Sequence, residues 1–157
     1  MRIVVLLAWL AYLALLLLSL PLLPARLGNP GHDLPKLAYV AVMLASATLP
    51  LLLMGESLLR WIGHHAPGLI SMPNKAYWMA PQRREASLTR LNAHMQWMRL
   101  WLCLVMAGVH LDVLWRTHPA WPQPPAWMAG LALSVLLLSV VLWAVRAQKL
   151  FSRAAKP

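Results

Sequence analysis

One apolar segment of this 157-residue chain carries three side chains that could bind a soft metal ion. Cys103, Met106 and His110 lie at positions i, i+3 and i+7, and a helix places residues with this spacing on one face. Thiol, thioether and imidazole groups together suit Cu(I). Methionine and cysteine are also ordinary packing residues, and no other segment offers an obvious fourth ligand. We therefore expect packing, with a copper site as the alternative.

A carboxylate inside an apolar segment is a second candidate for chemistry, because charged groups at membrane depth are costly and mark functional sites. Glu56 lies four residues before Arg60, and Arg99 is expected at a similar depth. An ion pair with either arginine is the simplest role for Glu56. No second buried acid accompanies it, which argues against proton-coupled transport.

The histidines supply two further alternatives. A divalent cation site or proton path near one surface would use His32, Asp33, His110, Asp112 and His118. Asp112 and Arg116 are four residues apart, so an ordinary ion pair competes with that role. A haem near the other surface would need two facing helices and would use His64, His65 or His94.

Catalytic motifs are missing from the sequence. It contains no HExxH, GxSxG or Walker A string. Cys103 is the only cysteine, which excludes a CxxC redox pair and an intrachain disulfide. We expect a protein that is not an enzyme and holds no cofactor, with copper and haem as the alternatives above.

The most distinctive string is MPNKAYWMAPQRRE, at residues 72–85. Its prolines stiffen the chain, its aromatic rings suit the headgroup level of a membrane, and its arginines can bind phosphates. We predict a surface that binds lipid headgroups or a partner, formed by Pro73, Asn74, Lys75, Tyr77, Trp78, Pro81, Arg83 and Arg84.

This string resembles a motif, P-N-[KR]-x-Y-W-x-A-P-x-R-R-E, of an uncharacterised bacterial family of four-helix membrane proteins. That family is distantly allied to the SdpI-type immunity proteins, and the resemblance covers about 14 residues of this chain. It implies an architecture of four membrane helices with the motif between the second and the third. It also implies the bacterial cytoplasmic, or inner, membrane as the location.

The elements that must position these residues follow from composition. Hydrophobic residues make up 61% of the chain and charged residues 11%, against roughly 25% charged in soluble domains. An all-α bundle of four membrane helices is predicted, because each of four apolar stretches can cross a core of about 30 Å. They cover about residues 3–23, 35–63, 95–115 and 126–145 of a single integral membrane domain, 1–157.

Three details refine this bundle. The first stretch is too long for a signal peptide and lacks a good cleavage site, so we expect an uncleaved helix. Pro50 should kink the second helix, with the hydroxyl of Ser46 or Thr48 available to the freed carbonyl. Residues 64–92 form a basic, amphipathic polar loop, and its part after Pro81 lacks helix breakers, which predicts a long third helix.

Charge sets the orientation and the partners. The net charge is +10, and because the basic residues flank apolar spans, anionic lipid headgroups rather than nucleic acid explain it. Eleven of the 14 basic residues fall on the side of the termini and the 64–92 loop, which predicts that this side is cytoplasmic. Most tryptophans fall near span ends, as interfacial anchors do.

Together these patterns favour a membrane protein that acts by binding. We expect an accessory subunit of a membrane complex or an envelope-stress or immunity-type protein, whose partner is another membrane protein or a second copy of the chain. The alternative is a metal- or haem-handling redox protein, and a small transporter around Glu56 is a third possibility.

Overall fold

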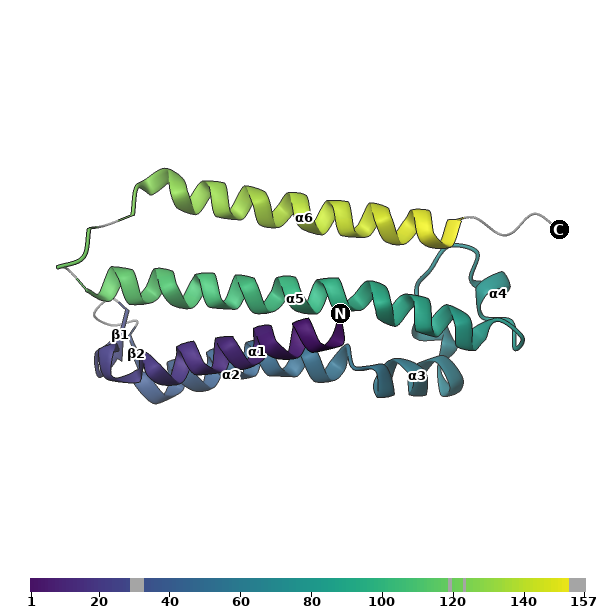
Figure 1. Cartoon of the computed structure of the whole chain (residues 1–157), viewed down its shortest axis with the longest axis horizontal. Coiled ribbons are helices and arrows are strands. Elements are labelled where there is room, and N and C mark those ends of the chain that lie inside the picture. Colours follow the sequence, from purple (N-terminus) through teal and green to yellow (C-terminus); the bar gives the residue numbers. More distant parts are fainter. Residues whose placement is uncertain (29–32, 119, 123, 153–157) are drawn as a thin grey trace.

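The computed structural model describes residues 1–28, 33–118, 120–122 and 124–152, and this part of the chain is mostly helical. The longest helix, α5, lies in the centre, with α1 and α2 on one side and α6 on the other (Figure 1). The elements in chain order are α1 (Arg2–Leu18), η1 (Leu20–Leu22), β1 (Arg26–Leu27), β2 (Leu34–Pro35), α2 (Lys36–Leu53), α3 (Glu56–His65), η2 (Pro67–Leu69), α4 (Lys75–Trp78), α5 (Arg84–Thr117) and α6 (Ala126–Ser152).

Three helices are long and apolar enough to cross a membrane, as expected of a multi-pass membrane protein. They are Lys36–Leu53, Arg84–Thr117 and the part Gly130–Ser152 of α6. The first helix is shorter than predicted: α1 has 17 residues and ends at Leu18. Pro21 explains this end, because it has no N–H and its ring clashes with the carbonyl one turn earlier.

The second apolar stretch forms two helices rather than one kinked helix. Pro50 lies inside α2, and the helix ends only at Leu53. Gly55 then takes an extended conformation and caps α3, while its N–H donates to Leu52 O at 2.9 Å. A Cβ at Gly55 would lie 2.7 Å from that carbonyl oxygen, so the tight approach needs glycine. The predicted helix over 35–63 was wrong at this point.

A short β-hairpin, which the all-helical prediction missed, joins α1 to α2. Strands β1 and β2 pair antiparallel over two residues each. Arg26 Nη1 lies 3.0 Å from Asp33 Oδ2 beside these strands. His32, a predicted cation ligand, lies outside the described residues. We call this end of the bundle the hairpin end and the opposite end, with α3 and α4, the loop end (Figure 1).

The long third helix is confirmed. Helix α5 runs for 34 residues, about 50 Å at roughly 1.5 Å per residue, so it joins the two ends of the bundle. The last helix, α6, continues to Ser152, beyond the predicted end at 145.

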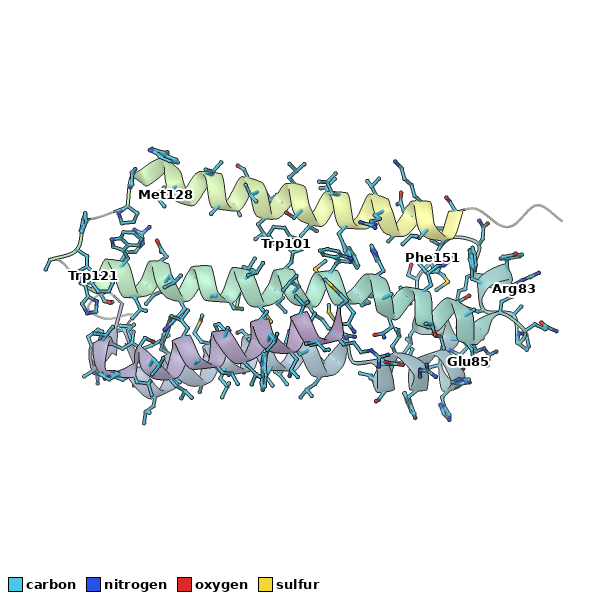
Figure 2. All side chains as sticks on the ribbon, in the orientation of Figure 1. Arg83, Glu85, Trp101, Trp121, Met128 and Phe151 are labelled. Atoms are coloured by element: carbon cyan, nitrogen blue, oxygen red, sulfur yellow. The ribbon has the colours of Figure 1, made fainter. Side chains whose placement is uncertain are left out.

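Two apolar clusters hold these helices together. The hairpin-end apolar cluster packs α1, α2 and α5 together and includes Tyr12, Met43 and Leu114. The loop-end cluster packs Phe151 of α6 against Leu88 and Met79. Between its ends α6 lies apart from α5, with Trp101 in the space between them (Figure 2), and an apolar cavity of about 170 Å³ separates the two helices there.

Candidate binding site

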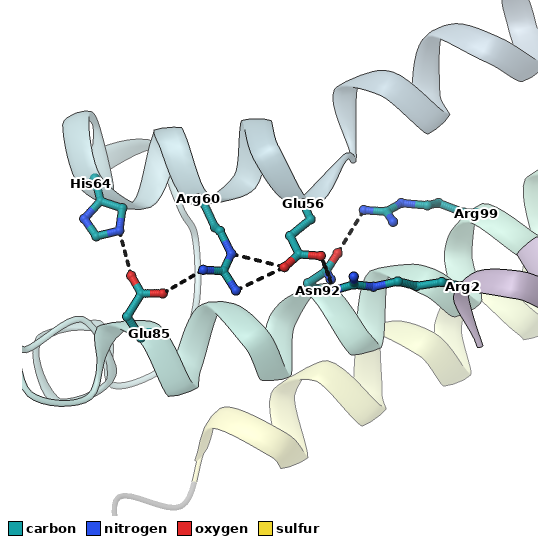
Figure 3. A network of polar contacts seen from close by, with 7 residues as sticks. All are labelled: Arg2, Glu56, Arg60, His64, Glu85, Asn92 and Arg99. Carbon is teal, nitrogen blue, oxygen red and sulfur yellow. Dashed lines mark hydrogen bonds and ion pairs between the residues drawn. The ribbon is translucent and has the colours of Figure 1, made fainter. Parts of the chain in front are cut away.

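Seven polar side chains form a network at the loop end (Figure 3), here called the loop-end network. They come from α1, α3 and α5, and are Arg2, Glu56, Arg60, His64, Glu85, Asn92 and Arg99. Glu56 is central: it pairs with Arg2 and with Arg60, whose Nη2 lies 3.0 Å from Oε1. Its Oε2 also accepts from Asn92 Nδ2 at 3.3 Å. The ion pair of Glu56 with Arg60, expected from their spacing, is confirmed.

A second carboxylate closes the outer part of this network. Glu85 Oε2 lies 3.1 Å from Arg60 Nη1, and Glu85 Oε1 lies 2.7 Å from His64 Nε2. Arg60 therefore bridges the two glutamates and ties α3 to α5. These groups are all substantially exposed, so the pairs position the helices more than they stabilise the fold.

Arg99 is the exception in the network, because it is buried and lacks an ion pair. Only 6% of the residue is exposed, and its Nη2 donates to Asn92 Oδ1 at 3.1 Å. Among the described residues no carboxylate lies within ion-pair distance of Arg99, and its Nε has no hydrogen-bond partner. A buried cation without an ion pair is costly, and the network has three arginines for its two glutamates, so one positive charge lacks a carboxylate of its own.

A cavity of about 370 Å³ adjoins Arg99 between α1, α2 and α5. Its lining combines the charged ends of the network with apolar and neutral polar side chains, and consists of Arg2, Val5, Leu6, Trp9, Thr48, Leu51, Leu52, Glu56, Gln96 and Arg99. Trp9 Nε1 and Thr48 Oγ1 also lack hydrogen-bond partners within the described part of the chain. Thr48 therefore does not cap the carbonyl that Pro50 frees, contrary to one option from the sequence.

Two residues of the predicted binding string fasten the loop to the end of α6. Asn74 Nδ2 donates to Ser152 O at 2.7 Å, and Trp78 Nε1 donates to Phe151 O at 2.7 Å. The last carbonyls of a helix lack partners within the helix, and these side chains supply them. Asn74 takes a left-handed conformation, with φ 51°. Trp78 also packs edge-on against the Phe151 ring, with centroids 5.7 Å apart.

Three basic residues of the string, together with Arg90 of α5, form a basic face outside this anchor. Arg83 lies over the Tyr77 ring at 4.0 Å, and Arg90 lies over the Trp78 ring at 5.3 Å. The backbone holds two further cations, because Lys75 Nζ donates to Gly68 O and Arg84 Nε to Met79 O. Pro73, Pro81 and Arg83 are exposed. We call Lys75, Arg83, Arg84 and Arg90 the basic face.

The predicted copper stripe lies in the hairpin half of α5 with its members in different surroundings. Cys103 is buried, with 2% of its surface exposed, and Met106 packs against the hairpin-end apolar cluster. His110 is fully buried, with Nε2 2.6 Å from Ser19 Oγ and Nδ1 2.8 Å from Tyr39 Oη. Both ring nitrogens thus have partners from the chain itself. Ligation of a metal by this set stays a prediction.

Ser19, Tyr39 and His110 form a second polar group, here called the hairpin-end polar cluster. Ser19 Oγ donates to Leu16 O at 3.0 Å, so it accepts from the N–H at Nε2 of His110. Burial favours the neutral imidazole, and in that form Nδ1 accepts from the hydroxyl of Tyr39. Every polar atom of the cluster is paired.

The remaining predicted residues fall into separate pairs. Asp112 and Arg116 form the expected ion pair, with Oδ2 and Nε 2.7 Å apart, and His118 stacks on Trp121. Of the candidate haem ligands, His64 contacts Glu85, His65 stacks on Trp61, and His94 stacks on Trp143 at 4.7 Å. In the described part of the chain, no three His, Cys, Asp or Glu side chains gather as a metal site would require. Haem binding stays a prediction.

Sequence reasoning missed the cavity and most of the residues around it. One signal was present: Asn92, Gln96 and Arg99 are spaced by four and three residues, so they share a face of α5 with Cys103 and His110. Such a polar stripe along an apolar helix indicates an inward face. Trp9 and Thr48 carried no such signal, because single polar atoms in apolar helices are common.

The fold and the network define a helical, multi-pass membrane protein with an open cavity lined by two arginines and a glutamate between α1, α2 and α5. No family model, curated protein or solved structure matches the chain.

Proposed function

We propose that this chain is a non-enzymatic membrane protein that acts by binding an acidic membrane-protein partner at the basic face. In this proposal the bundle crosses the bacterial cytoplasmic membrane four times, with α1 as the fourth span and both termini in the cytoplasm. The chain then serves as an accessory subunit of a membrane complex or as an envelope-stress or immunity-type protein.

The observation that carries the proposal is the fixed geometry of the basic face. Asn74 and Trp78 anchor the loop to α6, so the cations around them project from a stiff platform. Arg83 is stacked on a ring rather than paired with a carboxylate, which leaves its N–H groups available. A cation held in place loses less conformational freedom when a partner binds than a flexible one does.

Charge at this end supports an acidic partner. Counted over the described residues, the loop end holds nine basic side chains and two acidic ones, Glu56 and Glu85. The glutamates are already engaged within the loop-end network. The surplus therefore lies on the outside, where a complementary acidic surface steers association and fixes its register.

A matched pair of triple variants tests this function. We expect Lys75→Gln, Arg83→Gln and Arg84→Gln together to remove the partner while the chain still inserts, because the anchors Asn74 and Trp78 are kept. The control variant, Arg26→Gln, Lys36→Gln and Arg116→Gln, loses the same charge at the hairpin end and should keep the partner.

The measurement is the native mass and polypeptide content of the full chain extracted from its own membrane in mild detergent. The parent should give an assembly of fixed stoichiometry that comes apart when salt rises from about 0.15 M to about 1 M, because the Debye length then falls to roughly 3 Å. Partner loss in both triple variants, or an assembly unaffected by the first, would contradict the proposal. So would a peak that carries anionic lipid and no second polypeptide.

A further inference from the structure

The cavity beside Arg99 has the features of a ligand site separate from the basic face. Side chains that carry hydrogen-bond donors line it from three helices: Arg99 and Gln96 from α5, Trp9 from α1, and Thr48 from α2. Arg99 Nε, Trp9 Nε1 and Thr48 Oγ1 lack a partner in the described part of the chain. Since nearly all buried polar groups are hydrogen-bonded in native proteins, these unpaired donors favour a ligand that accepts hydrogen bonds.

The charge of the cavity favours an anion. Arg99 is more than nine-tenths buried and has no carboxylate partner among the described residues. Glu56 also lines the cavity, but its two oxygens are engaged by Arg2, Arg60 and Asn92. A negative group beside Arg99 would offset the cost of burying the guanidinium, and hydrogen bonds to an ionised acceptor are the strong ones.

The other half of the lining is aliphatic and faces outward. Val5 lies at the buried side, while Leu6 and Leu52 are 54% and 65% exposed. They belong to α1 and α2, which lie side by side here (Figure 1). Because these leucines sit on helices that face lipid, a ligand in the cavity can keep its hydrocarbon part in the membrane. A ligand with an anionic head and an aliphatic tail matches both halves.

We propose that this cavity binds the phosphate headgroup of a membrane lipid, with Arg99, Trp9 and Thr48 as hydrogen-bond donors and Leu6 and Leu52 beside the acyl chain. A phosphate monoester has three free oxygens, which suits donors arriving from three helices better than the two oxygens of a carboxylate. Arg99 supplies the charge, and Trp9 and Thr48 supply direction. The site uses none of the residues of the basic face.

The test uses the full chain in a neutral detergent with phosphatidic acid as the probe and native mass spectrometry as the measurement. Phosphatidylcholine with the same acyl chains is the comparison lipid, and inorganic phosphate is the competitor. We expect phosphatidic acid to bind at one site at least tenfold more tightly than phosphatidylcholine. Excess inorganic phosphate should displace little of it, because the free ion lacks the hydrocarbon part.

A charge-neutral double variant locates the site. Trp9→Phe with Thr48→Val removes two donors, keeps an aromatic ring at one position and the shape at the other, and leaves the +10 charge, so general attraction to anionic lipid is unchanged. Loss of two hydrogen bonds to a charged group should weaken phosphatidic acid binding by about 100-fold. The control, Trp127→Phe with Thr117→Val, makes the same exchanges away from the cavity and should bind as the parent does.

Three results would overturn the proposal. They are equal affinity for the two lipids, unchanged binding by the Trp9 and Thr48 variant, and inorganic phosphate that displaces the lipid at equal concentration. The last would mean that the cavity takes a free oxyanion instead of a lipid. Loss of the protein partner in the earlier experiment would leave all of these outcomes unaffected, so the two proposals fail separately.

Discussion

The two ends of the bundle bury polar groups in opposite ways. At the hairpin end, Ser19, Tyr39 and His110 form a neutral cluster in which every polar atom has a partner. At the loop end, the buried Arg99 donates one hydrogen bond, to Asn92, and has an unpartnered Nε, and a cavity of about 370 Å³ adjoins it. A closed, neutral cluster stabilises a fold, whereas an open, charged one costs stability and gains from a ligand.

The contrast distinguishes a residue that stabilises the fold from one that we propose binds a ligand, both on α5. His110 and Arg99 lie three turns apart on the same face of α5, so they meet the same neighbouring helices. Their chemistry differs because of what lies beside each side chain. His110 is hydrogen-bonded to Ser19, which caps α1, and to Tyr39 of α2, whereas Arg99 adjoins the cavity between those helices. We therefore expect variants at the two positions to differ in kind: one should affect unfolding, the other binding.

The largest effect on stability should come from His110→Ala. It removes a fully buried ring and leaves the hydroxyl of Tyr39 without its partner, which together should cost about 3 kcal/mol. Unfolding in mixed micelles, followed by circular dichroism, measures this. His65→Ala removes an exposed histidine and should cost less than about 1 kcal/mol. An equal loss of unfolding free energy in the two variants would contradict a stabilising role for the hairpin-end polar cluster.

Arg99→Met should change stability much less, by about 1 kcal/mol or less in either direction. The variant loses the hydrogen bond to Asn92 but also removes a buried cation without an ion pair, and these terms oppose each other. The same unfolding experiment, run without added lipid, checks the value. A loss as large as that of His110→Ala would contradict the view that Arg99 is kept for binding.

The most local effect should come from Asn74→Ala, which removes the hydrogen bonds to the last carbonyls of α6 and should cost about 1 kcal/mol. The change should stay local, because Asn74 serves only the last carbonyls of α6. Hydrogen exchange should speed up in the last turn of α6 and nowhere in α5. The exposed Pro73→Ala is the control and should leave exchange unchanged. Faster exchange throughout the bundle would show that the loop anchor supports both ends.

Much of the fold could be predicted from the sequence, because long apolar runs and proline positions leave few choices. The extended third helix and the pairs of Glu56 with Arg60 and Asp112 with Arg116 follow from local spacing. The break between α2 and α3 at Gly55 and the end of α1 at Leu18, before Pro21, also have local causes. The predicted ends of both helices are too late in the chain. Local signals thus explain the elements and their ends.

The candidate site could not be predicted in the same way, because it depends on distant residues. The cavity needs Trp9, Thr48 and Arg99 to meet from three helices, and the spacing within one helix does not reveal which faces meet. The same holds for Asn74 and Trp78: their string suggested a free surface, but tertiary contact with the end of α6 uses both. Such roles become visible only when the helices are assembled.

The most direct test of this account is the phosphatidic acid titration of the parent chain and the Arg99→Met variant by native mass spectrometry. We expect one tightly bound phosphatidic acid on the parent, and a variant that folds yet binds phosphatidic acid no better than phosphatidylcholine. A variant that keeps the preference of the parent for phosphatidic acid would contradict the claim that the unpaired cation at the loop end is a binding group.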